Sequence, residues 1–243
     1  MNKFAEHVWP LSAAVIDNPL HISGLSVSEL AKEYGTPLYV FDEATIRDAC
    51  QQYKAAFSSY PGGVEFSYAS KAFLNLAIAK LLLDEGLDFD VVSLGEMQMA
   101  LHAGARPEQL HLHGNAKPRF ELEEAVKAGI GRIAVDNLDE ANTLADICRE
   151  LDKSTSIILR IEPAVASNTH KAIQTGQNGS KFGLSLKLVD SFVEIINRSP
   201  HLELVGLHFH LGSQLFDLTD YQEALGVVLD LMVDLWDEHQ IEI

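Results

Sequence analysis

Cysteine and positive charge are both scarce in this 243-residue chain. The two cysteines, Cys50 and Cys148, lie far apart on segments expected to be helical, without the spacing of metal ligands or of a disulfide framework. We therefore interpret them as buried or half-buried thiols. Lys and Arg number 18 against 35 Asp and Glu, which gives a net charge of −17. So acidic a surface disfavours binding to nucleic acid or to anionic membranes, which requires basic patches.

Long apolar runs and low-complexity stretches are absent as well. No apolar run reaches the roughly 20 residues that cross a bilayer, and residues 1–20 lack the continuous apolar centre of a signal peptide. With 8 Pro, 16 Gly and no run of like charges, disorder is not expected. A composition of 47% hydrophobic and 22% charged residues suits one large globular domain, or one domain and a fragment of another. A reducing, cytoplasmic setting is the expectation.

Short β-rich runs alternate with amphipathic helical stretches from about residue 25 onward. Ser26 and Glu29 have the spacing of a capping box, which predicts a helix that Gly35 ends. A strand is expected at 37–41 and a helix at 43–59, and strand–helix units follow. The expected strands are 64–69, 88–92, 110–113, 133–136, 156–162 and 204–210. The expected helices are 73–85, 94–104, 119–129, 138–151, 186–198 and 218–239.

Strands separated by helix-length segments form parallel βαβ units, which build either a doubly wound sheet or a (β/α)8 barrel. Side-chain alternation favours the barrel. Ser67 and Ala69 in the first strand, and His208 and His210 in the last, give one face small or polar residues, whereas strands covered on both faces are apolar on both. Barrel enzymes carry their sites at strand C-terminal ends, although open sheets also use these ends. The unusual polar residues gather there: Lys71, Asp90, His113, Asn115, Asp136, Arg160 and His210.

The strand–helix units are fewer than the eight of a closed barrel. The last expected helix ends near Gln240, and a seventh strand would begin at Ile241–Ile243. We therefore expect an α/β fold with an incomplete (β/α)8 barrel of about six units, cut off before its seventh strand.

Two segments carry residues suited to cofactor chemistry. Lys71 ends a strand among small residues, and burial there would lower its pKa and free the amine for Schiff-base chemistry. A lysine that reaches solvent at a strand end is the plainer interpretation. His210 ends another strand before Gly212 and Ser213, which offer a flat ring for stacking and a hydroxyl with free amides for a phosphate. A packed histidine beside an ordinary turn fits the same spacing.

At these two segments, Tyr68–Ala72 and Gly206–Gln214, the sequence resembles the alanine-racemase-fold (fold type III) decarboxylases. Within that group it is most similar to the diaminopimelate decarboxylase family. Further similar segments follow in the family's order: Tyr34–Asp42, Phe89–Glu96, His113–Lys117, Val135–Asn137, Leu159–Pro163, Thr175–Gly176 and Ser180–Gly183. One motif alone would be weak, but the ordered series covers roughly residues 25–240 and identifies the chain as a member.

The resemblance implies pyridoxal 5'-phosphate as the cofactor and gives five residues a role. Lys71 would hold the cofactor covalently and, once displaced by substrate, act as an acid–base group. His210 would stack on the pyridine ring, and Ser213 would bind the phosphate. Asp90 and Arg160 would position Lys71 and the ring. We expect no metal ligands among them.

Several positions depart from the family pattern. Ser70 stands where valine or a similar residue is usual, Ala116 replaces an asparagine, and Glu162 stands where asparagine is frequent. His208 is interpreted as a residue of the barrel interior. Three family features are missing from the sequence: a triple-glycine phosphate loop, a Glu-Pro-Gly-Arg-like strand, and a C-terminal β domain with its catalytic cysteine and substrate-binding tyrosine.

The resemblance further implies that the intact protein converts meso-2,6-diaminopimelate to L-lysine and CO2 in lysine biosynthesis, as a homodimer with shared sites. Residues 1–42 would lead into the barrel, and residues 43–243 would form the cofactor-binding domain. We expect this truncated form to be inactive alone. Three alternatives stay open: an ornithine, arginine or carboxynorspermidine decarboxylase, a non-enzymatic single-domain pyridoxal-phosphate barrel, and a non-catalytic regulator. Tyr34–Asp42 argues against the second, and Lys71 argues against the third.

Overall fold

The computed structural model describes residues 8–163, 182–213, 215 and 218–243. The chain divides into two compact units, residues 1–66 with 80–87 and residues 67–79 with 88–243. Part of the family resemblance rests on Thr175–Gly176, Ser180–Lys181 and Gln214, which lie outside the described residues.

The first unit contains a small antiparallel sheet and two helices. Its short strands pair in the order β1–β2–β3. The elements are β1 (Ala14–Val15), β2 (Leu20–Ile22), β3 (Leu25–Ser26), α1 (Val27–Tyr34) and α2 (Glu43–Ala56).

Two predictions for this unit are wrong. Ser26 stands at the N-cap of α1, but its side chain makes no capping hydrogen bond, because the residue is buried and held in β3 opposite His21. The capping box with Glu29 therefore does not form. The segment 37–41 is not a strand, since its β-forming side chains have no ladder partner in the described chain. Gly35 does end α1, with a φ of 80°.

Asp42 is the polar centre of this unit. It is buried at the N-cap of α2, where its carboxylate accepts hydrogen bonds from the Thr45 backbone N–H at 3.1 Å, Ser12 Oγ at 2.7 Å and Ser23 Oγ at 2.8 Å. Burial raises the pKa of Asp42, but these hydrogen bonds outweigh it and lower the pKa to about 2. One carboxylate thus joins the start of α2 to two loops of the unit.

The second unit is built on a parallel sheet. Its strands pair in the order β4–β5–β6–β7–β8–β10, and β9 pairs with the end of β8. The strands are β4 (Ser67–Ala69), β5 (Asp88–Val91), β6 (Leu110–Leu112), β7 (Arg132–Val135), β8 (Thr155–Glu162), β9 (Leu184–Ser185) and β10 (Leu202–His208).

The order of these strands distinguishes the two candidate folds. From β4 to β8 each strand pairs in parallel with the next one along the chain, and β10 continues the series beside β8. A doubly wound sheet reverses its strand order at a switch point, and this sheet does not. The prediction of an incomplete α/β barrel is therefore confirmed. Within the described residues the sheet ends at β4 on one side and at β10 on the other.

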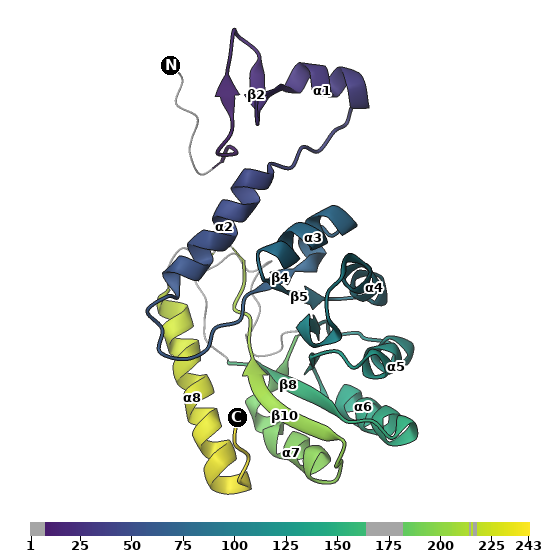
Figure 1. Ribbon diagram of the computed structural model, residues 1–243. Helices are drawn as coiled ribbons and strands as arrows, with labels where there is room; N and C mark the ends of the chain where they lie inside the picture. The colour runs from purple at the N-terminus through teal and green to yellow at the C-terminus, as the bar shows by residue number, and fades with distance from the viewer. Residues whose placement is uncertain (1–7, 164–181, 214, 216–217) are drawn as a thin grey trace. The chain divides into compact units, whose positions relative to one another are not determined.

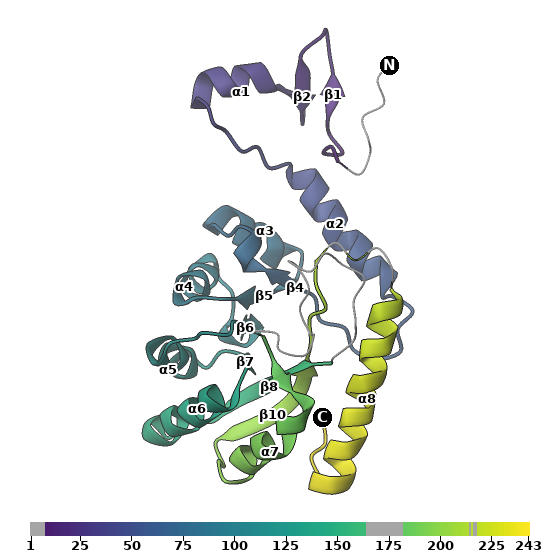
Figure 2. The same ribbon diagram turned by 180° about the vertical axis from the view of Figure 1, so that it is seen from behind.

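Helices connect the strands. Figures 1 and 2 show α4, α5, α6 and α7 along one face of the curved sheet. The helices are α3 (Leu76–Asp84), α4 (Leu94–Ala103), α5 (Arg119–Ala128), α6 (Leu138–Leu151), α7 (Val189–Asn197) and α8 (Thr219–His239), with 3-10 turns η1 (Ser70–Ala72), η2 (Pro107–Gln109) and η3 (Leu186–Leu188).

The core lies between this face of the sheet and the helices. Alternate strand residues point into it and are almost fully buried: Phe89, Val91, Leu110, Leu112, Ile133, Val135, Ile157, Leu159 and Ile161. Leu122, Leu144 and Phe192 fill the gap from the helix side, also with 0–1% exposure. Because side chains of a strand alternate between faces, the residues between the buried ones point to the interior of the partial barrel.

Local capping explains why helices start directly after strands. The side chains of Ser93 and Asn137 accept hydrogen bonds from the backbone N–H groups of Glu96 at 3.3 Å and Glu140 at 2.9 Å. Each cap satisfies a backbone donor that the first helical turn leaves unpaired. β5 and β7 each end two residues before the cap of the following helix.

The predicted element boundaries differ from the observed ones mainly at the ends of the sheet. The first strand is shorter than predicted and the last runs from 202 to 208 instead of 204 to 210, so His210 lies beyond it. Residues 241–243 form no strand in the described chain. The helix at 138–151 has its predicted bounds.

Both cysteines are buried and free, as predicted. Burial raises the pKa of Cys148 to about 11, which keeps its thiol protonated. None of the described helices combines the length and the apolar character that a membrane span needs.

Replacing Phe192 by Ala should destabilise the second unit strongly. The ring has 0% exposure on α7, and loss of so large a buried side chain costs about 3–5 kcal/mol. The matched control is Phe120→Ala on α5, where the ring is 57% exposed and the change should stay within about 0.5 kcal/mol. Urea unfolding followed by circular dichroism measures both. Equal losses in the two variants would contradict the assignment of the core.

Candidate active site

A cavity of about 650 Å³ opens at the C-terminal ends of the strands of the second unit. All five residues proposed from the sequence line it: Lys71, Asp90, Arg160, His210 and Ser213. They come from β5, β8 and the segments that follow β4 and β10. Parallel strands place their C-terminal ends at one edge, which brings together residues that lie far apart in the sequence.

Lys71 lies on η1, two residues beyond the end of β4, and is exposed. The prediction that it is buried is therefore wrong. The reason is its position, because β4 has only three residues and forms one edge of the described sheet. The charge of Lys71 nevertheless affects a residue inside the cavity, His210. Burial lowers the pKa of the His210 ring, and the positive charges of Arg160 and Lys71 lower it further.

Asp90 lies between two histidines. Its carboxylate is 3.5 Å from His111 Nδ1 and 3.5 Å from His113 Nε2. The register explains both contacts, since Asp90 pairs with His111 on the neighbouring strand and His113 is the next residue on the same face. Burial raises the pKa of Asp90, but hydrogen bonds from the two imidazoles outweigh it and hold the pKa below its usual value. The carboxylate thus stays ionised.

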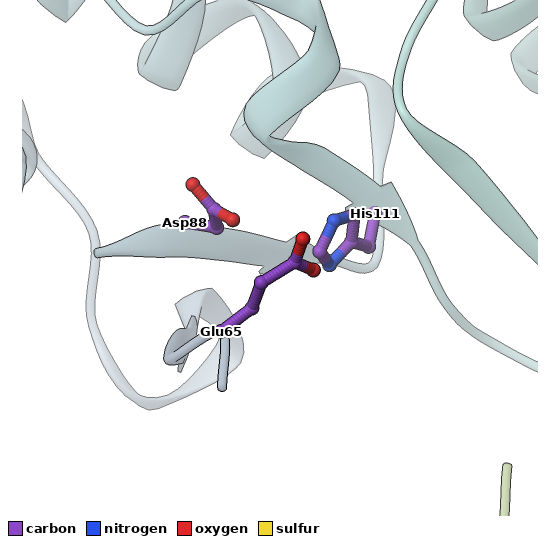
Figure 3. Close-up of side chains that lie close together, drawn as sticks. All are labelled: Glu65, Asp88 and His111. Atoms are coloured by element: carbon purple, nitrogen blue, oxygen red, sulfur yellow. The ribbon is translucent and has the colours of Figure 1, made fainter. Parts of the chain in front are cut away.

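His111 contacts Asp90 of the cavity wall, and the sequence reasoning missed it. It is buried, and its Nδ1 lies 3.3 Å from Ser67 Oγ. Its ring projects from β6 on the side of Asp88 of β5 (Figure 3). The signal that could have found it is its spacing of two residues from His113, which places both rings on the inward face.

His208 also lines the cavity, and its predicted place in the barrel interior agrees with this. Its ring meets that of His113 edge to face, with 4.9 Å between the ring centroids. Burial, with the neighbouring charges of His113 and Arg160, lowers the pKa of His208 to about 3. Its Nδ1 is buried and has no hydrogen-bond partner among the described residues. A neutral ring with an open polar atom is suited to meet a bound ligand or water.

Arg160 is held from two sides. Its Nη1 lies 3.5 Å from the carboxylate of the buried Asp136, and its Cζ lies 4.5 Å from the centre of the Phe182 ring. Burial lowers the pKa of Arg160, and Asp136 opposes that shift. The contact between carboxylate and guanidinium fixes where this cation sits on the cavity wall.

Ser213 is exposed at the mouth of the cavity. It follows Gly212, whose φ of 146° is a backbone conformation that L side chains rarely adopt. The turn that presents Ser213 therefore requires glycine. Leu211, just before it, is fully buried against Ala224 and anchors the turn to α8.

Residues 43–241 match the pyridoxal binding domain of the pyridoxal-dependent decarboxylases. The chain belongs to this family. Diaminopimelate decarboxylase of Bacillus subtilis (strain 168) is 44% identical over 204 residues, which cover 83% of this chain and 46% of that protein. Diaminopimelate decarboxylase of Halalkalibacterium halodurans is 41% identical over 225 residues, which cover 92% and 51%. This chain spans about half the length of the curated relatives it matches.

Solved structures agree with these matches. The crystal structure of diaminopimelate decarboxylase from M. jannaschii in complex with L-lysine superposes with a TM-score of 0.87 at 33% identity, covering 96% of this chain and 55% of that chain. The fold, the family and the pyridoxal-binding domain are thereby established, and the predictions of the family and of its cofactor are confirmed.

The cavity of this pyridoxal-binding domain fits pyridoxal 5'-phosphate. Its volume falls within the range of small-molecule sites, about 300–1,000 Å³. Lys71 offers a primary amine, and Ser213 offers a hydroxyl beside a glycine turn for a phosphate. The His210 ring and the orphaned Nδ1 of His208 are available inside. The individual roles of these residues stay predictions.

His208 should remain neutral down to acidic pH. Its pKa of about 3 lies below the ordinary value of about 6.5, so its contribution to stability is complete above pH 6.5 and is lost as the pH falls toward 3. Nitrogen NMR of the imidazoles measures the titration, and His208→Asn identifies the signal. A His208 midpoint between pH 5 and 8 would show that burial does not control this ring.

Proposed function

We propose that this chain is the cofactor-binding part of a diaminopimelate decarboxylase, which converts meso-2,6-diaminopimelate to L-lysine and CO2. The observation that carries the proposal is the single cavity lined by Lys71, His210 and Ser213 in a chain of this family. Curated relatives with that name are 39–44% identical. Solved relatives from M. jannaschii and Helicobacter pylori were obtained in complex with L-lysine.

The residues of the cavity divide the work in this proposal. Bound pyridoxal phosphate supplies the electron sink that accepts the charge left at Cα after CO2 departs. The Nζ of Lys71 binds the cofactor and, when released, carries a proton to or from Cα. The His210 ring holds the cofactor's ring by stacking, and the Ser213 hydroxyl binds its phosphate. Asp90 and Arg160 keep this arrangement in position.

Two cations on the cavity wall are available to an anionic ligand, and the lining carboxylate of Glu121 accepts a hydrogen bond from the Leu94 backbone N–H at 3.0 Å. Lys71 and Arg160 are cationic, whereas burial keeps His208 neutral and lowers the pKa of His210. Asp90 is ionised but faces two imidazoles instead of standing alone. Fixed donors of this kind stabilise developing charge without reorganising during the reaction.

The choice of substrate rests on similarity. Structures of diaminopimelate decarboxylases from M. jannaschii and Helicobacter pylori match with TM-scores of 0.79–0.87 at 33–34% identity. The lysine decarboxylase of Selenomonas ruminantium matches at 0.74 and 27%, and a further diaminopimelate decarboxylase structure matches at 0.72 and 25%. The substrate assignment therefore rests mainly on the curated relatives, since those that are 39–44% identical are diaminopimelate decarboxylases. Glu162 stands where asparagine is frequent in the family, so the substrate preference has to be measured directly.

The organisation of the whole protein is proposed in the same way. Residues 1–42 lead into a cofactor-binding domain that occupies 43–243, which is supported by the start of the family match at residue 43. We further propose a homodimer in the cytoplasm as the working form.

Lys71 should be the residue that binds the cofactor. The purified chain is incubated with pyridoxal 5'-phosphate and reduced with borohydride, and the modified peptide is mapped by mass spectrometry. We expect the label on Lys71, because its amine lies at the cavity whose other walls suit the cofactor. Lys71→Ala should abolish it and Lys80→Ala should not. A label on Lys80 or Lys181, with none on Lys71, would refute the assignment.

The 243-residue polypeptide by itself should release CO2 from meso-diaminopimelate near the background rate. In the described sheet β4 and β10 are edges, which favours edge-to-edge association, and Lys71 is exposed beside one of them. Water at the reacting centre weakens electrostatic stabilisation. The measurement is CO2 release with cofactor in excess, from diaminopimelate, ornithine and arginine, beside a version extended to the length of the relatives. Preference of the extended version for ornithine or arginine would overturn the substrate assignment.

A further inference from the structure

Lys117 is a buried lysine that the proposed chemistry does not use. Its side chain is only 2% exposed. The ammonium group lies 2.7 Å from the Glu140 carboxylate and donates to the backbone carbonyls of Ala134, at 2.8 Å, and of Gly114. Two of the three donors of the ammonium thus bind carbonyls, and the Glu140 carboxylate faces its charge as an ion pair. The three partners lie on the segment after β6, on β7 and on α6.

Glu140 continues the network toward the cavity. It lies in the first turn of α6 with its side chain 5% exposed, and its carboxylate accepts a hydrogen bond from the backbone N–H of Asp136. The carboxylate of Asp136 in turn contacts the guanidinium of Arg160 at 3.5 Å. A continuous path thus runs from Lys117 through Glu140 and Asp136 to Arg160, with two cations and two carboxylates.

Stability alone does not account for this pair. Burial raises the pKa of Glu140 to about 7, even though Lys117 lowers it, and the charge of Asp136 raises it further. Holding the carboxylate ionised in the interior is therefore costly. Replacing a buried ion pair by packed apolar side chains is often neutral or stabilising. A buried ion pair is better explained by a role in fixing the conformation of the groups around it.

The structure that this ion pair would position is one wall of the cavity. Gly114, Asn115 and Ala116 line it between His113, which contacts Asp90, and Lys117. Gly114 has a φ of 121°, so the segment leaves β6 through a turn that L side chains rarely adopt. Lys117 bonds back to the Gly114 carbonyl and closes this turn.

We propose that Lys117 and Glu140 form a buried ionic clamp that positions two parts of the cofactor cavity, the wall at Gly114–Ala116 and, through Asp136, the guanidinium of Arg160. These are positioning residues: Lys117 borders the cavity, but its ammonium is held by Glu140 and two backbone carbonyls, so the pair acts on a ligand through its neighbours. The proposal rests on the function proposed above only in assigning the cavity to pyridoxal phosphate. The clamp itself is defined by the contacts of the protein.

The test uses the full chain in four forms. Lys117→Met with Glu140→Leu removes both charges together, so no uncompensated charge stays buried. Glu140→Gln keeps the shape of the carboxylate, and Lys117→Arg keeps the positive charge. The matched control is Lys127→Met, which breaks an exposed ion pair with Glu123 on α5. Thermal unfolding shows which variants are folded.

The first measurement is amide hydrogen exchange of the cofactor-free protein. In the folded double variant, exchange at residues 114–116 should rise about tenfold, which corresponds to about 1.4 kcal/mol. Glu140→Gln should give a smaller rise, Lys117→Arg should retain most of the protection, and Lys127→Met should change nothing. If the double variant does not fold, Glu140→Gln decides. Unchanged exchange at 114–116 in the folded variants would overturn the clamp.

The second measurement is the affinity for pyridoxal 5'-phosphate, followed by the absorption spectrum of the bound cofactor. The double variant should bind on the order of tenfold to a hundredfold more weakly, because small displacements of positioning groups have effects of this size. Equal affinity in the double variant and in Lys127→Met would overturn the positioning role. If the unaltered chain takes no cofactor on Lys71, the proposed function fails, while the exchange data still decide whether the clamp exists.

Discussion

The parallel pairing of each strand with its neighbour in sequence is the constraint on which the site depends. It fixes which side chains share a face, so Phe89 and Ile133 point to the helices while Asp90 and Arg160 point inward. It also gives the strands one direction, so their polar C-terminal residues meet at a single cavity. A slip of one residue in any strand would turn its side chains to the opposite face. The core and the site are therefore specified by the same register.

Charge inside the second unit is organised in contacts between opposite signs or dipoles. Asp90 faces two imidazoles, Arg160 faces Asp136, and Lys117 faces Glu140. Burial also disfavours the charged form of the His208 ring, whose pKa it lowers to about 3. A cavity built this way offers a ligand fixed cations and neutral rings. The buried charges are compensated by neighbouring protein groups and not by water.

The features that the sequence predicted well are those with a local signal. Strand order followed from the alternation of strand and helix patterns, and the inward face followed from residues two apart, such as His208 and His210. The helix at 138–151 was predicted with its observed bounds because its cap, Asn137, is a property of the immediate sequence. The five candidate residues, chosen from their place at or just beyond strand ends and from the family resemblance, line one cavity.

The features that were mispredicted depend on contacts made elsewhere. Ser26 is a good capping residue that the sheet holds in another conformation. Segment 37–41 has β-forming residues but no ladder partner in the described chain. Lys71 is exposed because its strand is an edge, which no property of its neighbours in sequence reveals. His111 was missed since its importance comes from Asp90 on another strand.

The same strand order has a consequence for how the second unit folds. Because sheet neighbours are nearly always sequence neighbours, each strand can join the sheet as soon as the helix before it has formed. Contacts of short sequence separation close small loops, so the entropy lost at each step is modest. The unit can therefore assemble progressively from β4 to β10 as it leaves the ribosome, before distant parts of the chain have been made.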